Sequence, residues 1–318
     1  MALNLARDAD RELLPALFGA RMVDTADLGE IAELIYVCKA QALVARGREM
    51  GLALAAVGEP CSGEAIRQII EATAAPPPSR PPLVLDLSAL WAGPLCAHLL
   101  QLAGANVVKA ESRARPDALR QGDPAFFALL NGGKDSVSAD LADSALHALI
   151  AAADIVIEAA RPRALVQLGI DAGAIVAAKP GMVWITITGH GATGEAADWT
   201  GFGDDCGVAG GLSAALCEAS GSVGFVGDAI ADPLTGIAAA RAAWQAWSSG
   251  SGGRIGLSMS GVAAQALADE QAFDAELLRR ELAAWGAANG RAFPKVAARE
   301  PAGVVHPFGA DNARWLSC

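Results

Sequence analysis

The sequence has few aromatic side chains and fewer basic than acidic ones, and the shortage of basic side chains excludes two classes of partner. Aromatic residues make up 5% of the 318 residues, and 24 Lys and Arg stand against 35 Asp and Glu, which gives a formal net charge of −11. A protein that binds nucleic acid or anionic lipid needs a basic face to contact phosphates. We therefore expect neither a nucleic acid nor a membrane surface as a partner.

Zinc-binding and membrane-spanning patterns are also missing from the sequence. No two cysteines have CxxC spacing, and the four histidines, at 98, 147, 190 and 306, form no zinc pattern, so no metal is expected. No apolar run reaches the length of a membrane span, and the charged start MALNLARDADRELL does not look like a signal peptide. Scattered cysteines are typical of a reducing compartment, which predicts a cytoplasmic protein.

The apolar residues that are present, 53% of the chain, are arranged in segments. The proline-rich run at 76–82 cannot continue a helix and is interpreted as a linker. Residues 1–75 are predicted to form a small, mainly helical segment, with helices within 24–54 and at 63–72. Residues 83–260 alternate between strands and helices, and 261–318 form a helical and irregular tail. Strands are expected at 83–87, 106–110, 154–158, 182–188 and 254–259.

This alternation predicts an α/β fold with a Rossmann-like, mostly parallel sheet and flanking helices. Such sheets bind ligands beyond the C-terminal ends of their strands, here at 88–94, 110–120, 159–163 and 189–205. The first of these loops contains neither GxGxxG nor a P-loop lysine. It is either a tight turn or a place where a ligand approaches the start of a helix.

Basic residues are concentrated between 104 and 134, where five Lys and Arg stand against three acids. The stretch contains Lys109, Arg113, Arg115, Arg120 and Lys134. A net charge of +2 within an acidic chain indicates either an ordinary solvated face or a site for a phosphate-bearing small molecule.

Two further positions could carry chemistry. His190 lies in the glycine-rich loop GHGATG, where it is either a structural residue or a catalytic or ligand contact. Asp204 and Asp205 stand at the predicted start of a helix. They either cap that helix or supply a carboxylate nucleophile or proton-transfer base.

Taken in order, these segments resemble the family III CoA-transferases, which include formyl-CoA transferase, carnitine-CoA transferase and α-methylacyl-CoA racemase. The resemblance rests on VLDLS with AGP at 84–94, GANVVKAE at 104–111, NGGKDSV at 131–137, ADIVIE at 153–158, ITGHGATG at 187–194 and ADPLTG at 231–236. Each motif is weak alone, but their shared order over 83–259 makes the signal strong.

The resemblance implies an acyl-CoA substrate, a carboxylic acid as second substrate, and a homodimer whose chains interlock. It implies contacts to CoA from a set of loop residues and cations: Trp91, Ala92, Gly93, Lys109, Arg113, Arg120, Asn131, Lys134, Arg161, Gly189 and Gly191. In the transferases an Asp forms a mixed anhydride with the acyl group, whereas in the racemases an Asp and a His exchange the proton beside the thioester. The corresponding candidates are Asp204, Asp205 and His190.

The chain departs from the family pattern at several places. The position of the family's catalytic Asp, counted from Gly194 and back from Gly211, is Gly203, so the acids are displaced by one or two residues. Trp91 replaces the glutamine of formyl-CoA transferases, and Gly132 replaces the usual arginine after Asn131. The family's second-domain insertion is missing after Met259, while residues 42–52 resemble part of that domain. The chain thus resembles the C-terminal half of a longer tandem relative.

Three functions follow from these observations. The first is transfer of CoA between acyl-CoA thioesters and carboxylic acids through an Asp acyl-anhydride. The second is an α-methylacyl-CoA racemase or isomerase using Asp and His. The third is a non-catalytic acyl-CoA-binding protein or subunit, which the glycine at 203 would favour.

Overall fold

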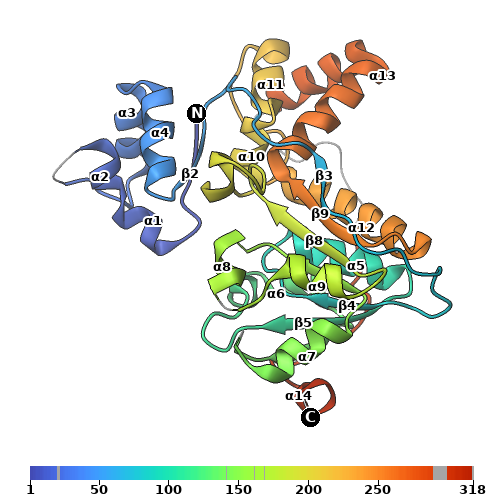
Figure 1. Cartoon of the computed structure of the whole chain (residues 1–318). Coiled ribbons are helices and arrows are strands. Elements are labelled where there is room, and N and C mark those ends of the chain that lie inside the picture. Colours follow the sequence, from blue (N-terminus) through green and yellow to red (C-terminus); the bar gives the residue numbers. More distant parts are fainter. Residues whose placement is uncertain (20–21, 141, 161, 168, 289–298, 317–318) are drawn as a thin grey trace. The chain divides into compact units, whose positions relative to one another are not determined.

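The computed structural model describes residues 1–19, 22–140, 142–160, 162–167, 169–288 and 299–316. Its contacts divide the chain into two compact units, each built from separate segments (Figure 1). Unit 1 comprises 1–65, 189–231 and 259–294, and unit 2 comprises 66–188, 232–258 and 295–318. The division into 1–75, 76–82, 83–260 and 261–318 follows chain order and stays a prediction.

Unit 2 is built on a seven-stranded sheet in the order β3-β9-β8-β7-β4-β5-β6. The strands are β3 (Ile66–Ile70), β4 (Leu83–Asp86), β5 (Asn106–Glu111), β6 (Asp135–Ser138), β7 (Ile155–Glu158), β8 (Val183–Thr188) and β9 (Gly253–Ser258). All neighbouring pairs are parallel except β3 and β9. Without β3 this is the Rossmann order, with its reversal between β4 and β7, which confirms the predicted α/β class.

Helices cover both faces of this sheet. They are α5 (Ala92–Leu102), α6 (Pro124–Asn131), α7 (Ser144–Ala152), α8 (Pro162–Gln167), α9 (Ala172–Ala178), α12 (Ala231–Ser249) and α14 (Asn312–Trp315), with the 3-10 turn η1 (Ala118–Gln121). Leu85 of β4 belongs to an apolar core with α7, α8 and α9. The next residue, Asp86, points to the opposite face, where α5 packs on β4, because successive strand side chains alternate.

Unit 1 is mainly helical. Its elements are β1 (Ala2–Asn4), α1 (Asp8–Glu12), α2 (Leu14–Phe18), α3 (Leu28–Tyr36), α4 (Ala40–Glu49), β2 (Ala53–Ala55), η2 (Glu195–Asp198), α10 (Gly203–Ala209), α11 (Leu212–Ser220) and α13 (Met259–Ala287). Strands β1 and β2 pair antiparallel, and Ala2 and Ala55 pack on Val208 of α10. None of the helices in the described ranges is long and apolar enough to cross a membrane.

The structure differs from the sequence-based predictions in three elements. Residues 63–72 were expected to be helical, but Ile66–Ile70 form β3, because the edge of β9 supplies the hydrogen bonds of a ladder. Strand β6 was not expected, since its sequence DSVS is mostly polar. The apolar spacing over 165–178 predicts one helix, but the structure has α8 and α9 separated near Gly169, whose φ of 79° is left-handed and ends a helical turn.

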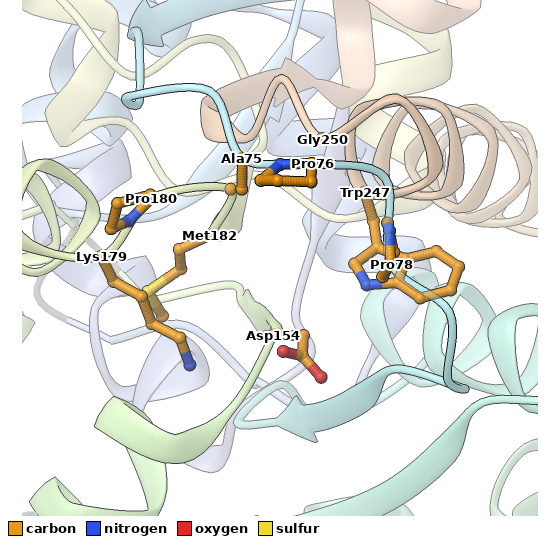
Figure 2. A pocket seen from close by; sticks show the side chains of 10 residues that line it. Ala75, Pro76, Pro78, Asp154, Lys179, Pro180, Met182, Trp247 and Gly250 are labelled. Atoms are coloured by element: carbon orange, nitrogen blue, oxygen red, sulfur yellow. The ribbon is translucent and has the colours of Figure 1, made fainter.

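The proline-rich segment packs against other parts of unit 2. The N–H of Ala75 donates to the Gly250 carbonyl at 2.8 Å. Pro76, Pro78 and Trp247 line a small pocket of about 80 Å³. Figure 2 shows these side chains, with Trp247 beside Pro78. The segment is therefore an anchored extended connection.

Candidate functional site

The loop after β4 is held in one conformation by side chains from two other segments. Leu90 has a φ of 67°, a left-handed conformation that residues other than glycine rarely adopt. Its N–H donates to Asp117 Oδ1 at 3.1 Å, and the N–H of Ala92 donates to Asp232 Oδ1 at 3.2 Å. A strained backbone that its surroundings fix in this way is typical of ligand-binding loops.

Glycine is required at the first turn of α5. A Cβ on Gly93 would lie 2.1 Å from the hydroxyl of Ser88, which itself donates a short hydrogen bond to Asp86. Beside it, Trp91 packs edge-to-face on Phe126 with ring centroids 4.9 Å apart. The three predicted contacts Trp91, Ala92 and Gly93 therefore share one closely packed turn.

Lys134 is buried beneath this turn. Its Nζ lies 2.9 Å from Asp86 Oδ2 and donates to the Pro94 carbonyl at 2.9 Å and to Asn131 Oδ1 at 3.0 Å. Burial lowers the pKa of Lys134 to about 8. Burial alone would raise the pKa of Asp86, but the charges of Lys134 and Lys109 outweigh it and hold that pKa below its usual value. Lys134 and Asn131 thus fix the start of α5.

Lys109 has a similar place under the loop. Its Nζ lies 2.9 Å from Asp117 Oδ2 and donates to the Ser88 carbonyl at 3.0 Å, and both charged side chains are buried. Burial would lower the pKa of Lys109, but the neighbouring carboxylates, led by Asp86 and Asp117, raise it above its usual value. Lys109 therefore stabilises the carboxylate that holds Leu90.

The two predicted arginines in the described part of this region differ in their pairing. Arg120 donates from Nε to both oxygens of Glu111, at 2.9 and 3.0 Å, and packs on the ring of Phe127. Arg113 is exposed, with Asp140 and Asp143 no closer than 3.7 and 3.6 Å. Arg113 is therefore the more loosely paired cation. Arg161 lies outside the described residues.

In unit 1, His190 and Asp205 form a buried pair. His190 Nε2 lies 3.6 Å from Asp205 Oδ2, and the two side chains are 1% and 0% exposed. The other oxygen of Asp205 accepts the N–H of Phe202 at 2.9 Å and so caps α10. Neither side chain is reachable by a ligand as large as acyl-CoA in this conformation.

Asp204 faces a different environment, although it is the preceding residue. It is partly exposed, and its Oδ1 accepts the N–H of Ala229 at 3.0 Å. Burial raises the pKa of Asp204, the Ala229 N–H opposes this, and the charges of Asp228 and Asp205 add to the increase. A raised pKa makes a carboxylate more basic, as a nucleophile or general base requires.

The glycine-rich loop after β8 runs against the start of α10. A Cβ on Gly189 would lie 2.8 Å from Gly201 Cα, so the two backbones touch. Gly191 has a φ of 126°, which only glycine adopts readily. Gly189 and Gly191 therefore shape the loop that carries His190.

The predicted residues fall into two groups. Unit 2 holds Trp91, Ala92, Gly93, Lys109, Arg113, Arg120, Asn131 and Lys134, and unit 1 holds Gly189, His190, Gly191, Asp204 and Asp205. Sequence reasoning missed Asp86 and Asp117, which hold the loop after β4. It also missed Arg48, whose guanidinium lies 3.9 Å from the ring of Trp199, which packs edge-to-face on His190. Asp86 had a sequence signal, since it is a lone acid within an apolar strand.

The chain is similar in sequence to curated CoA-transferases and in fold to a solved structure. A succinate–glutarate CoA-transferase of Agrobacterium fabrum is 30% identical over 219 residues, covering 61% of this chain and 55% of that protein. A succinyl-CoA–D-citramalate CoA-transferase of Chloroflexus aurantiacus is 32% identical over 142 residues, covering 41% and 35%. A solved CAIB/BAIF family protein from Brucella suis aligns with a TM-score of 0.54 and 26% identity, covering 71% of this chain and 60% of that one.

The chain thus spans about half the length, or less, of these curated relatives. The model of CoA-transferase family III matches residues 82–297, which is more than half of the chain and includes both groups of predicted site residues but not Arg48. On these matches and on its Rossmann-like sheet, the chain belongs to CoA-transferase family III.

Proposed function

We propose that this chain transfers CoA between an acyl-CoA thioester and a free carboxylic acid, with Asp204 as the residue that receives the acyl group. The contrast at the start of α10 carries the proposal: Asp204 is partly exposed and its pKa is raised, whereas Asp205 is fully buried beside His190. Membership of a CoA-transferase family supports the reaction class.

The reaction alternates anhydrides and thioesters on Asp204. The carboxylate attacks the thioester carbonyl, the C–S bond breaks, and CoA leaves as a thiolate, which gives a mixed anhydride. The thiolate attacks the aspartyl carbonyl, which releases the first acid and leaves an aspartyl-CoA thioester. The second acid attacks that thioester to form a new anhydride and CoA thiolate. Attack of the thiolate on the new acyl carbonyl yields the product and frees Asp204.

The loop at 88–94 is the proposed binding segment for CoA in unit 2. We assign the diphosphate to Arg113, because its own acids lie beyond hydrogen-bond distance. Lys109, Asn131 and Lys134 support binding by fixing the loop rather than by touching phosphate. Contacts of Arg120, Arg161, Gly189 and Gly191 with CoA stay predictions from the family resemblance.

The substrates proposed for the first assays are succinyl-CoA and glutarate, because relatives are named for transfer from or to such acids. Isotopically labelled glutarate is incubated with succinyl-CoA and the purified chain, and label in the thioester pool is measured. Asp204→Asn keeps an oxygen that can accept the Ala229 N–H but lacks a nucleophilic carboxylate. We expect it to lose label exchange by at least about 10³-fold, while the neighbouring Asp228→Asn variant retains it.

Exchange that survives in Asp204→Asn would move the role away from Asp204. Hydroxylamine should trap the acyl-enzyme during turnover, and an active enzyme that is not trapped would contradict the anhydride. Uptake of deuterium beside the thioester without label exchange would indicate the racemase, for which the His190–Asp205 pair is the only described support. Thioester binding without either reaction would leave a binding protein.

The proposal also includes a homodimeric assembly and a cytoplasmic location. The homodimer, with interlocked chains, would cover exposed apolar side chains such as Tyr36 and Phe273. A cytoplasmic location is supported by free thiols at Cys38, Cys61 and Cys96.

A further inference from the structure

Three side chains of different chemical type lie close together in unit 1. His190 Nε2, Asp205 Oδ2 and Cys206 Sγ lie within 4.0 Å of one another: 3.6 Å from N to O, 4.0 Å from S to N and 3.9 Å from S to O. All three side chains are buried. From these contacts we propose that unit 1 binds one zinc ion through His190, Asp205 and Cys206, a site that is independent of the proposed CoA transfer.

The separations fit an ion better than direct hydrogen bonds. An N···O distance of 3.6 Å is too long for a good hydrogen bond. Tetrahedral zinc with ligand bonds of 2.0–2.3 Å separates its ligand atoms by about 3.3–3.6 Å. The observed triangle therefore needs to contract by only a few tenths of an ångström. Both neighbours approach the same nitrogen of His190, which is the convergence that a metal requires and a relay of proton transfers does not.

The neighbouring backbone leaves His190 Nε2 uncovered. A Cβ on Gly201 would lie 2.6 Å from Cys206 Sγ and 3.0 Å from His190 Nε2. Only glycine at this position leaves the two ligand atoms uncovered. The other ring nitrogen, His190 Nδ1, is buried without a hydrogen-bond partner among the described residues, so the pair with Asp205 does not satisfy the ring.

The charges also match a divalent cation. A thiolate, a carboxylate and a neutral imidazole sum to −2, which Zn²⁺ cancels, and Cys, His and Asp are the ligand types that zinc prefers. On binding, the S–H proton of Cys206 passes to the solvent. Three protein ligands leave a fourth position for water, and the Gly189 carbonyl, which accepts the S–H of Cys206 at 3.3 Å, would lose that hydrogen bond on zinc binding.

A second group of similar composition lacks this geometry. In unit 2, His306 Nδ1 makes a direct 2.7 Å hydrogen bond to Asp311 Oδ2, and Arg314 pairs with Asp135 at 2.7 Å. Both carboxylates already have a direct partner within the protein, so we expect no zinc there.

The test is metal binding by the full-length chain. Chelator-treated protein is titrated with Co²⁺ and Zn²⁺, following the thiolate-to-cobalt absorption band, the metal content and the thermal midpoint. We expect about one ion per chain, a thiolate band, the release of about one proton and a higher midpoint with zinc. Absence of binding by the wild-type chain would overturn the proposal.

Variants separate this site from adventitious binding. Cys206→Ser should abolish the band and weaken zinc binding by more than about a hundredfold, beyond the effect of losing an outer partner. Gly201→Ala, which keeps every ligand but places a methyl group against two of them, should also prevent binding while circular dichroism shows a folded chain. Cys217→Ser and His306→Ala are matched controls and should bind as wild type. A thiolate band that persists in Cys206→Ser, or that is lost in Cys217→Ser, would contradict the assignment.

Discussion

Asp204 and Asp205 are adjacent in the chain but do different things, because successive residues of a helix point about 100° apart. Asp205 points inward to His190 and Cys206, while Asp204 points toward Ala229 and is partly exposed. Gly203, where the count from the family motifs predicts the catalytic acid, is the first residue of α10 and offers no side chain. Asp204 is the accessible carboxylate nearest to that position.

The pKa of Asp204 provides a test of its proposed role at the scale of single residues. Since the charge of Asp228 raises this pKa, removing it in Asp228→Asn should lower the pKa, so that Asp204 stays ionised at lower pH. A carboxylate nucleophile loses activity as pH falls through its pKa, and the acid limb of kcat/KM should therefore move to lower pH in the variant. Activity near pH 7 should be unchanged.

The matched control is Glu12→Gln, which removes an exposed acid from α1 of the same unit. Its acid limb should coincide with that of the wild type. If the limb of Asp228→Asn does not move either, Asp204 is not the group that titrates.

At the scale of elements, the tail at 299–316 completes the edge of the sheet. The N–H of Ser136 on β6 donates to Asp311 Oδ2 at 2.7 Å, and the N–H of Ser138 donates to Asn312 Oδ1 at 2.9 Å. Asp311 returns its own N–H to the Ser136 carbonyl. An edge strand otherwise exposes such groups, so the tail protects β6 from pairing with other chains.

Loss of the Asp311 carboxylate should weaken the hydrogen bonding between the tail and β6. Asp311→Ala is expected to speed hydrogen exchange at the Ser136 amide by about 10- to 100-fold and to lower the free energy of unfolding by about 1–3 kcal/mol. Burial would raise the pKa of Asp311, but the His306 hydrogen bond, the Ser136 N–H and nearby charges lower it below 3.8. This stabilisation is thus complete above pH 3.8 and is lost as pH falls through the lowered value.

Exchange is measured by mass spectrometry on peptides that cover β6, with β8 as an internal reference. Asp143→Ala, at the N-cap of α7, is the matched control and should leave β6 unchanged. Unaltered protection of Ser136 in Asp311→Ala would show that the tail does not hold the edge.

At the scale of the whole molecule, charge is distributed differently from the expectation. The basic stretch at 104–134 is locally +2, yet Lys109, Lys134 and Arg120 are each paired with a carboxylate. These ion pairs neutralise the patch internally. The proposed substrate, an anionic acyl-CoA, would therefore approach a chain of net charge −11 with little local attraction.

Added salt should consequently increase the rate at which acyl-CoA associates with the chain. Screening weakens repulsion between like charges, so kcat/KM for acyl-CoA is expected to rise a few-fold between about 0.02 and 0.2 M salt. Initial rates at low acyl-CoA measure this, with an osmotically matched uncharged solute as control. A steep fall with salt would instead show that free cations steer the substrate.

The parallel strands other than β6, and the family, could be predicted from the sequence alone, since hydrophobic periodicity and short motifs are local properties of a chain. Local patterns failed where the partner decides the structure: Ile66–Ile70 forms a strand because β9 pairs with it. The same limit applies to charge, because the sequence shows that Lys134 is basic but not that Asp86 lies 2.9 Å away.

Only the tertiary structure brought His190 from the loop after β8 together with Asp205 and Cys206 of α10. No spacing rule finds such a group, since its members come from segments whose contact depends on how Gly189 packs against Gly201. The tertiary structure also gives Asp204 and Asp205 different environments. Burial and desolvation arise from packing by distant segments and not from the identity of a residue.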